Sequence, residues 1–136
     1  MSMHLKLFQA LKAVLNNISG ITAVVPAANI RPSEDPTQPA AGNTITYTWQ
    51  AGRVDKKARR GEGSLTLVAA SVDNKVSANS ILELVRNALS AQSLSYVGSP
   101  VVVHRFDEET FTDVGTTDGN RWQAAATFEV HMIEAP

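Results

Sequence analysis

The sequence predicts an α+β fold: a four-stranded antiparallel or mixed sheet with two helices packed on one face, long loops and a C-terminal β-hairpin. Two segments repeat apolar residues at intervals of three and four, which is the spacing of one helix face. Four other segments alternate apolar and polar residues or concentrate β-branched and aromatic residues, as strands do. The order along the chain is helix, two strands, helix, two strands, which is typical of helices segregated to one face of a sheet.

The first helix is predicted from about Leu5 to Ser19. Its polar positions face away from a single apolar stripe, and Ser19-Gly20 supplies a stop because glycine readily takes the left-handed conformation of helix C-termini. The stripe consists of Leu7, Leu11, Val14, Leu15 and Ile18.

Residues 21–43 are predicted to form a long excursion without a central strand or helix. Each proline there removes a backbone donor, and the prolines are Pro26, Pro32, Pro36 and Pro39. A loop of this length either contacts a neighbouring molecule or is simply mobile, and the sequence leaves both interpretations open.

Two strands follow, at Thr44 to Gln50 and at Ser64 to Val72. The first alternates threonines with an apolar face of Ile45, Tyr47 and Trp49. The second starts with a cluster of apolar residues, which predicts burial on both of its faces near its start. A polar loop is expected between the two strands.

The second helix is predicted to begin at a cap formed by Asp73 or Ser77 and to end near Ala91. Its apolar stripe consists of Ile81, Leu82, Val85, Ala88 and Leu89. The remainder is predicted to be a hairpin, with strands at Val101 to Val114 and Arg121 to Ile133 and turn residues at Gly115 to Asn120. In the last strand we expect the face that carries Trp122 and Phe128 to pack on the helices.

Length and composition fit a single domain over residues 1–136, because two separate cores would each be too small to offset the ordering entropy. The chain has no cysteine, which excludes disulfides, thiolate metal ligands and cysteine nucleophiles. Its formal net charge of −1 gives no overall attraction to nucleic acid or anionic lipid. Neither a membrane-spanning apolar run nor a secretory signal pattern is visible, so we expect no membrane association and synthesis without export.

The histidines and acidic residues predict neither a metal site nor a catalytic site. His4, His104 and His131 lack a second ligand-type residue at zinc-site spacing, although His104 and His131 could be neighbours across the hairpin as polar residues of a strand surface. The acidic run at residues 107–109 lies on a strand, where successive side chains point to opposite faces. We interpret it as a solvated strand end or a patch for a neighbouring subunit.

Serine and glycine motifs give no nucleophile and no nucleotide site. Ser64 and Ser99 lie near glycines but outside any Gly-x-Ser-x-Gly elbow. Gly61-Glu62-Gly63 precedes a strand, whereas phosphate-binding glycine loops follow a strand and open a helix. The sequence therefore predicts a protein that is not an enzyme and needs no cofactor.

One local feature stands out between the first two strands. Five of the twelve basic residues fall within eight positions, opposed there only by Asp55: Arg53, Lys56, Lys57, Arg59 and Arg60. This basic segment could meet phosphates or an acidic protein partner, or it could be a solvated charged loop. It contains no aromatic residue, so it gives no support for base stacking.

The order of segments over nearly the whole chain resembles the tail terminator, or tail-completion, proteins of phages with long non-contractile tails and of related gene transfer particles. The resembling segments are, in chain order, the helix Leu7 to Ile18, Val24-Val25-Pro26, Ile30-Arg31-Pro32, Ile45-Thr46-Tyr47, residues 65–71, the helix Ala78 to Leu89, and the hairpin that ends with Trp122 to Ile133.

The resemblance implies a structural virion protein of the tail, assembled in the host cytoplasm, that forms a homo-oligomeric, hexameric ring. Such a ring would sit at the head-proximal end of the tail tube, end tube polymerisation and offer a docking face to the neck protein. Its partners would be further copies of itself, the tail tube protein and the neck or head-completion protein. The basic segment would then line the lumen, where it could make non-specific contact with passing DNA, or touch the tube.

Two alternatives remain open at this point. One is another neck or head–tail connector protein with a similar α+β fold. The other is a small nucleic-acid-binding module that uses residues 53–60, which predicts binding that weakens steeply with salt because counterions are released.

Overall fold

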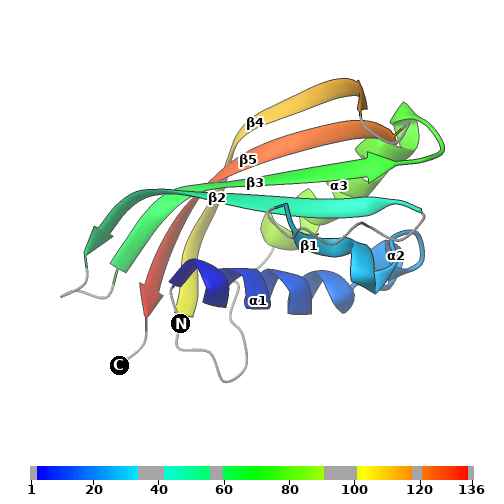
Figure 1. Cartoon of the computed structure of the whole chain (residues 1–136). Helices are drawn as coiled ribbons and strands as arrows, with labels where there is room; N and C mark the ends of the chain where they lie inside the picture. Colours follow the sequence, from blue (N-terminus) through cyan, green and yellow to red (C-terminus); the bar gives the residue numbers. More distant parts are fainter. Residues whose placement is uncertain (1–2, 34–41, 56–59, 91–100, 118–120, 135–136) are drawn as a thin grey trace.

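The computed structural model describes residues 3–33, 42–55, 60–90, 101–117 and 121–134 and has the predicted α+β fold (Figure 1). Its elements, in chain order, are α1 (Met3–Asn16), α2 (Ser19–Thr22), the 3-10 helix η1 (Ala27–Asn29), β1 (Ile30–Pro32), β2 (Thr44–Asp55), β3 (Arg60–Ser71), α3 (Lys75–Ser90), β4 (Val101–Thr117) and β5 (Arg121–Glu134).

The strands form one open mixed sheet in the order β1-β2-β3-β5-β4. The four long strands pair antiparallel, and β1 lies parallel to β2 at the edge. The predicted four strands are therefore confirmed, and β1 is a short addition of three residues within the proline-rich segment.

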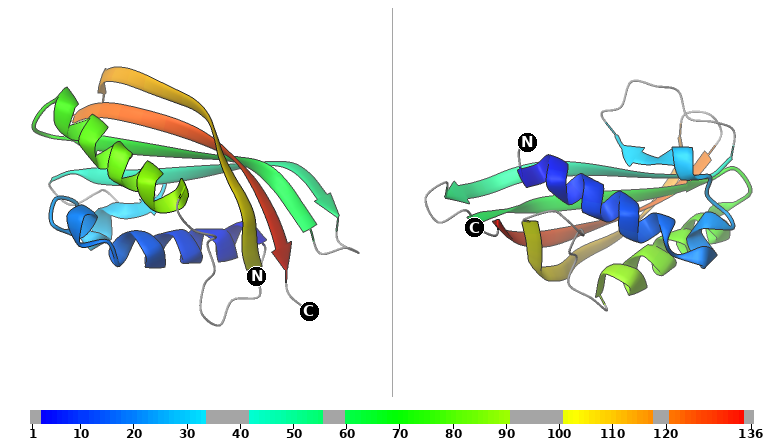
Figure 2. Two further views of the ribbon diagram at one scale, coloured as in Figure 1. Left: turned by 180° about the vertical axis from the view of Figure 1, so that it is seen from behind. Right: turned by 90° about the horizontal axis from the view of Figure 1, so that it is seen from below.

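Both long helices cover the same face of the sheet (Figure 2). Their buried residues meet the inward side chains of the strands, and the Phe8 ring of α1 packs edge-on against Tyr47 of β2 with ring centroids 4.8 Å apart. The predicted helix stripes are confirmed where they are buried most: Leu7, Leu11 and Leu15 on α1, and Ile81, Leu82, Val85 and Leu89 on α3.

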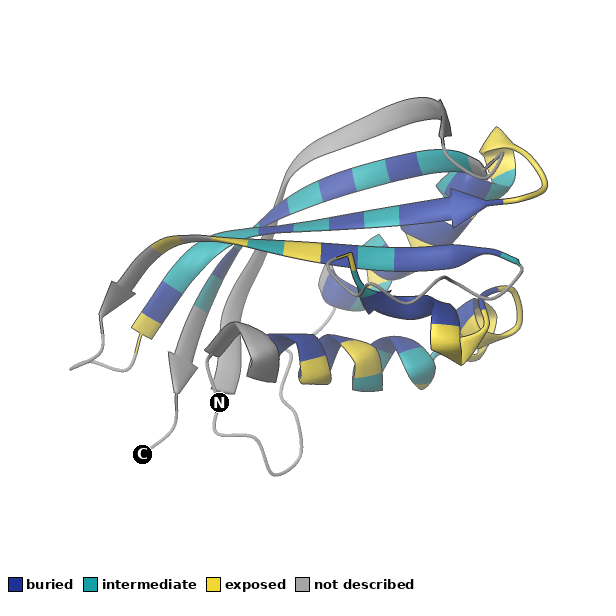
Figure 3. Ribbon diagram, viewed as in Figure 1, coloured by how far each residue is buried: buried dark blue, intermediate teal, exposed yellow. Residues whose placement is uncertain are grey.

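The inward face of the sheet follows the predicted alternation (Figure 3). Phe128 and Val130 of β5 are buried and Trp122 packs against the core, so the predicted face is confirmed. In β3, Leu65 and Leu67 point inward while the intervening residues are half-buried on the other face. The expectation that this strand is buried on both faces near its start is therefore wrong.

Several element ends differ from the prediction. The first helix ends at Asn16, since Ile18 has an extended backbone, and Ser19-Gly20 begins α2 instead of stopping α1. Gly20 lies near Leu84 of α3, and an added Cβ would be 3.7 Å from the leucine methyls, an ordinary van der Waals contact, so an alanine would fit at this position. The cap of α3 is neither Asp73 nor Ser77 but Asn74, whose Oδ1 accepts a 2.8 Å hydrogen bond from the Ser77 N–H.

Two predicted loops are shorter than expected because the strands continue into them. The strand β3 begins at Arg60, so Gly61-Glu62-Gly63 lies within a strand and not before one. An added Cβ on Gly63 would be 2.6 Å from Cζ2 of Trp49, so that ring occupies the space that a side chain would need. The strand β4 runs to Thr117 and so includes Gly115 to Thr117, for which turn residues are predicted; the rest of the predicted turn, residues 118–120, lies outside the described residues.

Asn43 joins three parts of the fold just before β2. Its Nδ2 donates to the carbonyl of Val24 at 3.0 Å, and its Oδ1 accepts from the N–H of Val72 at 3.0 Å. Its own carbonyl accepts from Nδ2 of the fully buried Asn29 at 3.1 Å. The Asn43 side chain therefore joins the segment after α2 to the end of β3, and its backbone carbonyl adds the approach to β1.

Among the described helices, none is both long and apolar enough to cross a membrane.

Candidate interaction surface

The sheet face opposite the helices carries a polar surface, and no helix of the described residues lies on it (Figure 2). Its positions follow from the register, which aligns Thr48, Thr66, Thr127 and Thr110 across the four long strands. The hydroxyls of Thr66 and Thr127 hydrogen-bond at 3.2 Å, and that of Thr48 hydrogen-bonds with Ser33 at 2.5 Å. We call the four residues with described side chains, Ser33, Thr48, Thr66 and Thr127, the hydroxyl row.

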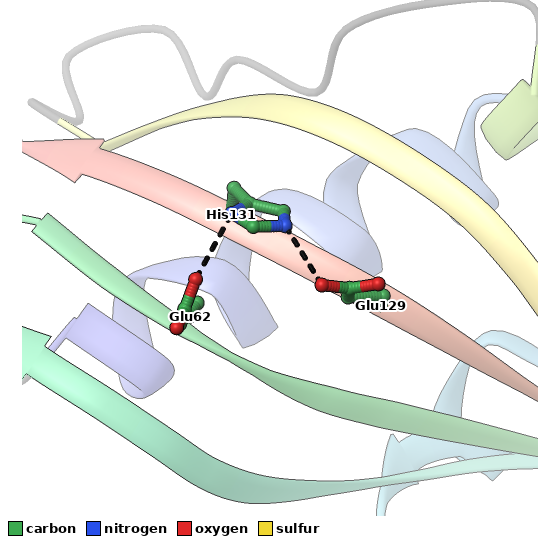
Figure 4. Close-up of polar contacts among 3 residues, drawn as sticks. All are labelled: Glu62, Glu129 and His131. Atoms are coloured by element: carbon green, nitrogen blue, oxygen red, sulfur yellow. Dashed lines mark hydrogen bonds and ion pairs between the residues drawn. The ribbon is translucent and has the colours of Figure 1, made fainter.

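A second group of polar residues lies further along β3 and β5 on the same face (Figure 4). The imidazole of His131 lies between two carboxylates: its Nδ1 is 3.3 Å from Oε2 of Glu62, and its Nε2 is 3.1 Å from Oε1 of Glu129. We call these three residues the His131 cluster. Only a doubly protonated imidazole donates to both carboxylates, whereas the neutral ring has one N–H.

The geometry of the His131 cluster favours a network of polar contacts among its three side chains over metal binding. The two carboxylates face different ring nitrogens, so one ion could not be ligated by both of them and by the ring. Within the described part of the chain, no group of three or more His, Asp or Glu residues is arranged to hold a metal ion. The three side chains are partly exposed, and contacts between charged or polar groups at the surface add little to the free energy of unfolding.

The first and last residues of the basic segment, Arg53 and Arg60, lie at the same end of the sheet as the His131 cluster. Arg53 is opposite Glu62 in the register, and Arg60 is opposite Asp55. Arg60 is exposed, whereas the side chain of Arg53 and all of residues 56–59, which include Lys56, Lys57 and Arg59, lie outside what the structure describes. This end of the β2–β3 hairpin reaches past the start of α1 in every view (Figures 1 and 2).

The other predicted candidates are placed only by strand register or not at all. In the register, Arg105 lies opposite His131, and His104 is the extra residue of a β4 bulge. The side chains of His104 and His4 are outside what the structure describes. The register puts Asp107 opposite Glu129, again without a described side chain. His131 is confirmed as a polar residue of a strand surface, while Ser64 lies half-buried in β3 and Ser99 is outside the described residues.

Sequence reasoning missed Glu62 and Glu129 as partners of His131. Alternation along β5 already placed Glu129 and His131 on one face, two residues apart. Glu62 is not predicted as a partner because the sequence predicts a start of β3 at Ser64. The pairing of β3 with β5 is what brings Glu62 opposite His131.

Neither known family profiles nor curated proteins match this sequence. Among solved structures, the fold is similar to a chain in the virion of a native gene transfer agent particle, with a TM-score of 0.77, 13% identity, and 96% of this chain and 97% of that chain covered. It is also similar to the bacteriophage SPP1 gp17 protein, with a TM-score of 0.51, 15% identity, and 97% and 91% covered. At these identities the likeness concerns the fold, over almost the full length of all three chains.

Proposed function

We propose that this chain is a structural virion protein that forms a hexameric ring at the head-proximal end of a phage-type tail tube. The ring ends tube polymerisation and offers the docking face for head–tail joining. In this role the protein works through surfaces and has no catalytic site. The observation that carries the proposal is the likeness of its fold, over 96% of the chain, to a virion chain of a gene transfer agent.

The described surface is compatible with assembly. Polar residues line the sheet face that no described helix covers, and the exposed large apolar residues Val24, Val72 and Val76 lie close to the ends of α2, β3 and α3. A ring of identical subunits needs two different surfaces on each subunit that complement each other. An open sheet has two such surfaces in its two edges.

The basic segment is proposed to line the ring lumen or to touch the tail tube. Two of its five members flank the His131 cluster in the register, at one end of the sheet. A concentration of arginine and lysine at that end would meet phosphates without reading base sequence.

The test is the mass of the purified protein by light scattering over a concentration series, followed by its effect on tube length when it is added to polymerising tail tube protein. Hexamers that shorten or cap the tubes are expected. A strict monomer that leaves tube length unchanged would contradict the proposal, and hexamers that bind the capsid connector but not the tube would favour a neck connector.

A variant with serine at all five basic positions should still form rings. If tube length and infectivity were also unchanged, the placement of the basic segment would be wrong.

The nucleic-acid-binding alternative is tested with the same sample. A module that binds through the basic segment would bind DNA with an affinity that falls steeply as salt rises. The ring protein is expected to bind free DNA weakly at any salt concentration.

A further inference from the structure

The two edges of the sheet differ in how much of their backbone is paired. Among the described residues, β1 pairs with β2 only at Ile45 to Tyr47, and one further hydrogen bond joins the Ser33 N–H to the Tyr47 carbonyl. From Trp49 to Asp55, no described strand lies beside β2 on that side. At the other edge, β5 is the one described strand that pairs with β4.

The direction of the backbone groups on β2 can be followed from its neighbours. The Tyr47 carbonyl points toward β1, and the Gln50 carbonyl points toward Gly63 of β3. Because these directions alternate along a strand, the N–H and C=O groups of Trp49 and Ala51 point to the unpaired side. Backbone groups in this position are a template for another strand.

The part of β2 without a described neighbour and a part of β4 without bulges lie at the same height along the strands. Gln50 is opposite Ser64, which is opposite Glu129, which in turn is opposite Asp107. Regular pairing of β4 with β5 holds from Arg105 to Glu108, and β2 is regular up to Ala51. Copies in a closed ring are related by rotation about one axis, so in a ring whose axis follows these strands the two segments meet without a shift along the strands.

The strand directions fit as well. The strands β2 and β4 run in opposite directions, because three antiparallel pairings separate them. If a second copy continues the sheet, its β4 therefore lies antiparallel to β2, the more stable arrangement of the two.

Bulges limit the length of any such pairing. Relative to β5, β4 carries extra residues at His104, Glu109 and Gly115, and β2 carries one at Gly52 relative to β3. Bulges bend and twist an edge strand and interrupt its ladder, which prevents indefinite edge-to-edge stacking. A short regular stretch between bulges suits a contact that forms only between subunits of a closed assembly.

We propose that β2, at Trp49 to Ala51, pairs antiparallel with β4, at Phe106 to Glu108, of a second copy of this chain. The sheet then continues from subunit to subunit. The inference rests on the proposed ring and names the contact that closes it.

The absence of cysteine from the chain makes a disulfide test unambiguous. Gln50→Cys is combined with Asp107→Cys or, to allow another register, with Arg105→Cys. Within one subunit, β2 and β4 are separated by three strand spacings, about 14 Å, whereas bridged cysteines need Cα atoms less than about 7 Å apart. Any disulfide between them therefore joins two copies. The matched control combines Gln50→Cys with Asn87→Cys, which is exposed on α3.

Each variant is oxidised mildly at micromolar concentration, and its mass is measured in the same sample before denaturing electrophoresis without reductant. At least one of the β2–β4 variants is expected to cross-link about a hundredfold faster than the control, because paired strands hold the thiols at a millimolar effective concentration. The products should form a ladder up to six chains. Rings of unchanged mass with no excess of cross-links over the control would overturn the edge pairing and leave the ring standing. A monomer at every concentration, without cross-links, would overturn both.

Discussion

Replacing Asn43 with alanine should destabilise the fold, because this residue joins segments that the sequence separates. Asn43→Ala removes the donor to the Val24 carbonyl and the acceptor for the Val72 N–H, both at 3.0 Å. The backbone carbonyl of residue 43, which accepts from Asn29, remains. The loss is therefore limited to two side-chain hydrogen bonds.

Each of these bonds is worth about 0.5–1.5 kcal/mol net, so the free energy of unfolding should fall by about 2 kcal/mol. Both bonds are only partly buried, and the side chains of Val24 and Val72 are 45% and 44% exposed. Water can therefore reach the released groups in part, which argues against the larger penalty of a fully buried orphan group.

The assay is urea unfolding followed by circular dichroism, at a concentration where light scattering shows monomers, because association would add its own stabilisation. With a slope of about 2 kcal/mol per molar urea, the midpoint should fall by about 1 M. The control is Asn87→Ala on the exposed face of α3, where a change within about 0.5 kcal/mol is expected. Equal midpoints for the two variants would refute the role given to Asn43.

Two further substitutions test local structure by the same unfolding assay. Gly63→Ala should lower the free energy of unfolding by about 1–3 kcal/mol, because the new Cβ would lie 2.6 Å from the Trp49 ring and against the Gln50 carbonyl. The control is Gly52→Ala, where the nearest atom would be 3.4 Å away. A larger loss of stability for Gly52→Ala than for Gly63→Ala would contradict this contact. Asn74→Ala should cost about 1 kcal/mol through loss of the α3 cap, and Asp73→Ala should cost less; the reverse order would mean that Asp73 is the effective cap.

Much of the fold could be predicted because periodic burial is a local signal. Apolar residues two apart in β5, and three and four apart in α1 and α3, indicated both the element type and the face that packs. The strand β1 has no such signal. It is three residues long, ends with Pro32, and forms by pairing with Ile45 to Tyr47 of β2, where Ile30 and Ile45 are both buried.

The polar surface could be predicted only in part, because its contacts depend on register. Alternation indicates which residues face outward, but it does not say that Thr66 meets Thr127 or that Glu62 meets His131. The glycines at 61 and 63 predict a loop by their composition, since nothing local shows that the Trp49 ring fills the place of a side chain at Gly63. Such contacts link residues far apart along the chain and follow from strand pairing.

The proposed contact between subunits also bears on why no short motif identifies this chain. Side chains of the hydroxyl row and the His131 cluster have polar partners within the subunit, so they do not need particular side chains on a neighbouring subunit. Edge pairing uses backbone groups, which are the same for almost every residue. It depends on where the bulges fall and on how far β1 covers β2, both of which are features of the fold. A ring closed in this way would keep its contacts through many sequence changes, provided that the strand order and the bulges are kept. We therefore expect ring formation to survive most substitutions at outward positions of β2 and β4. Insertions that shift the bulges should prevent it.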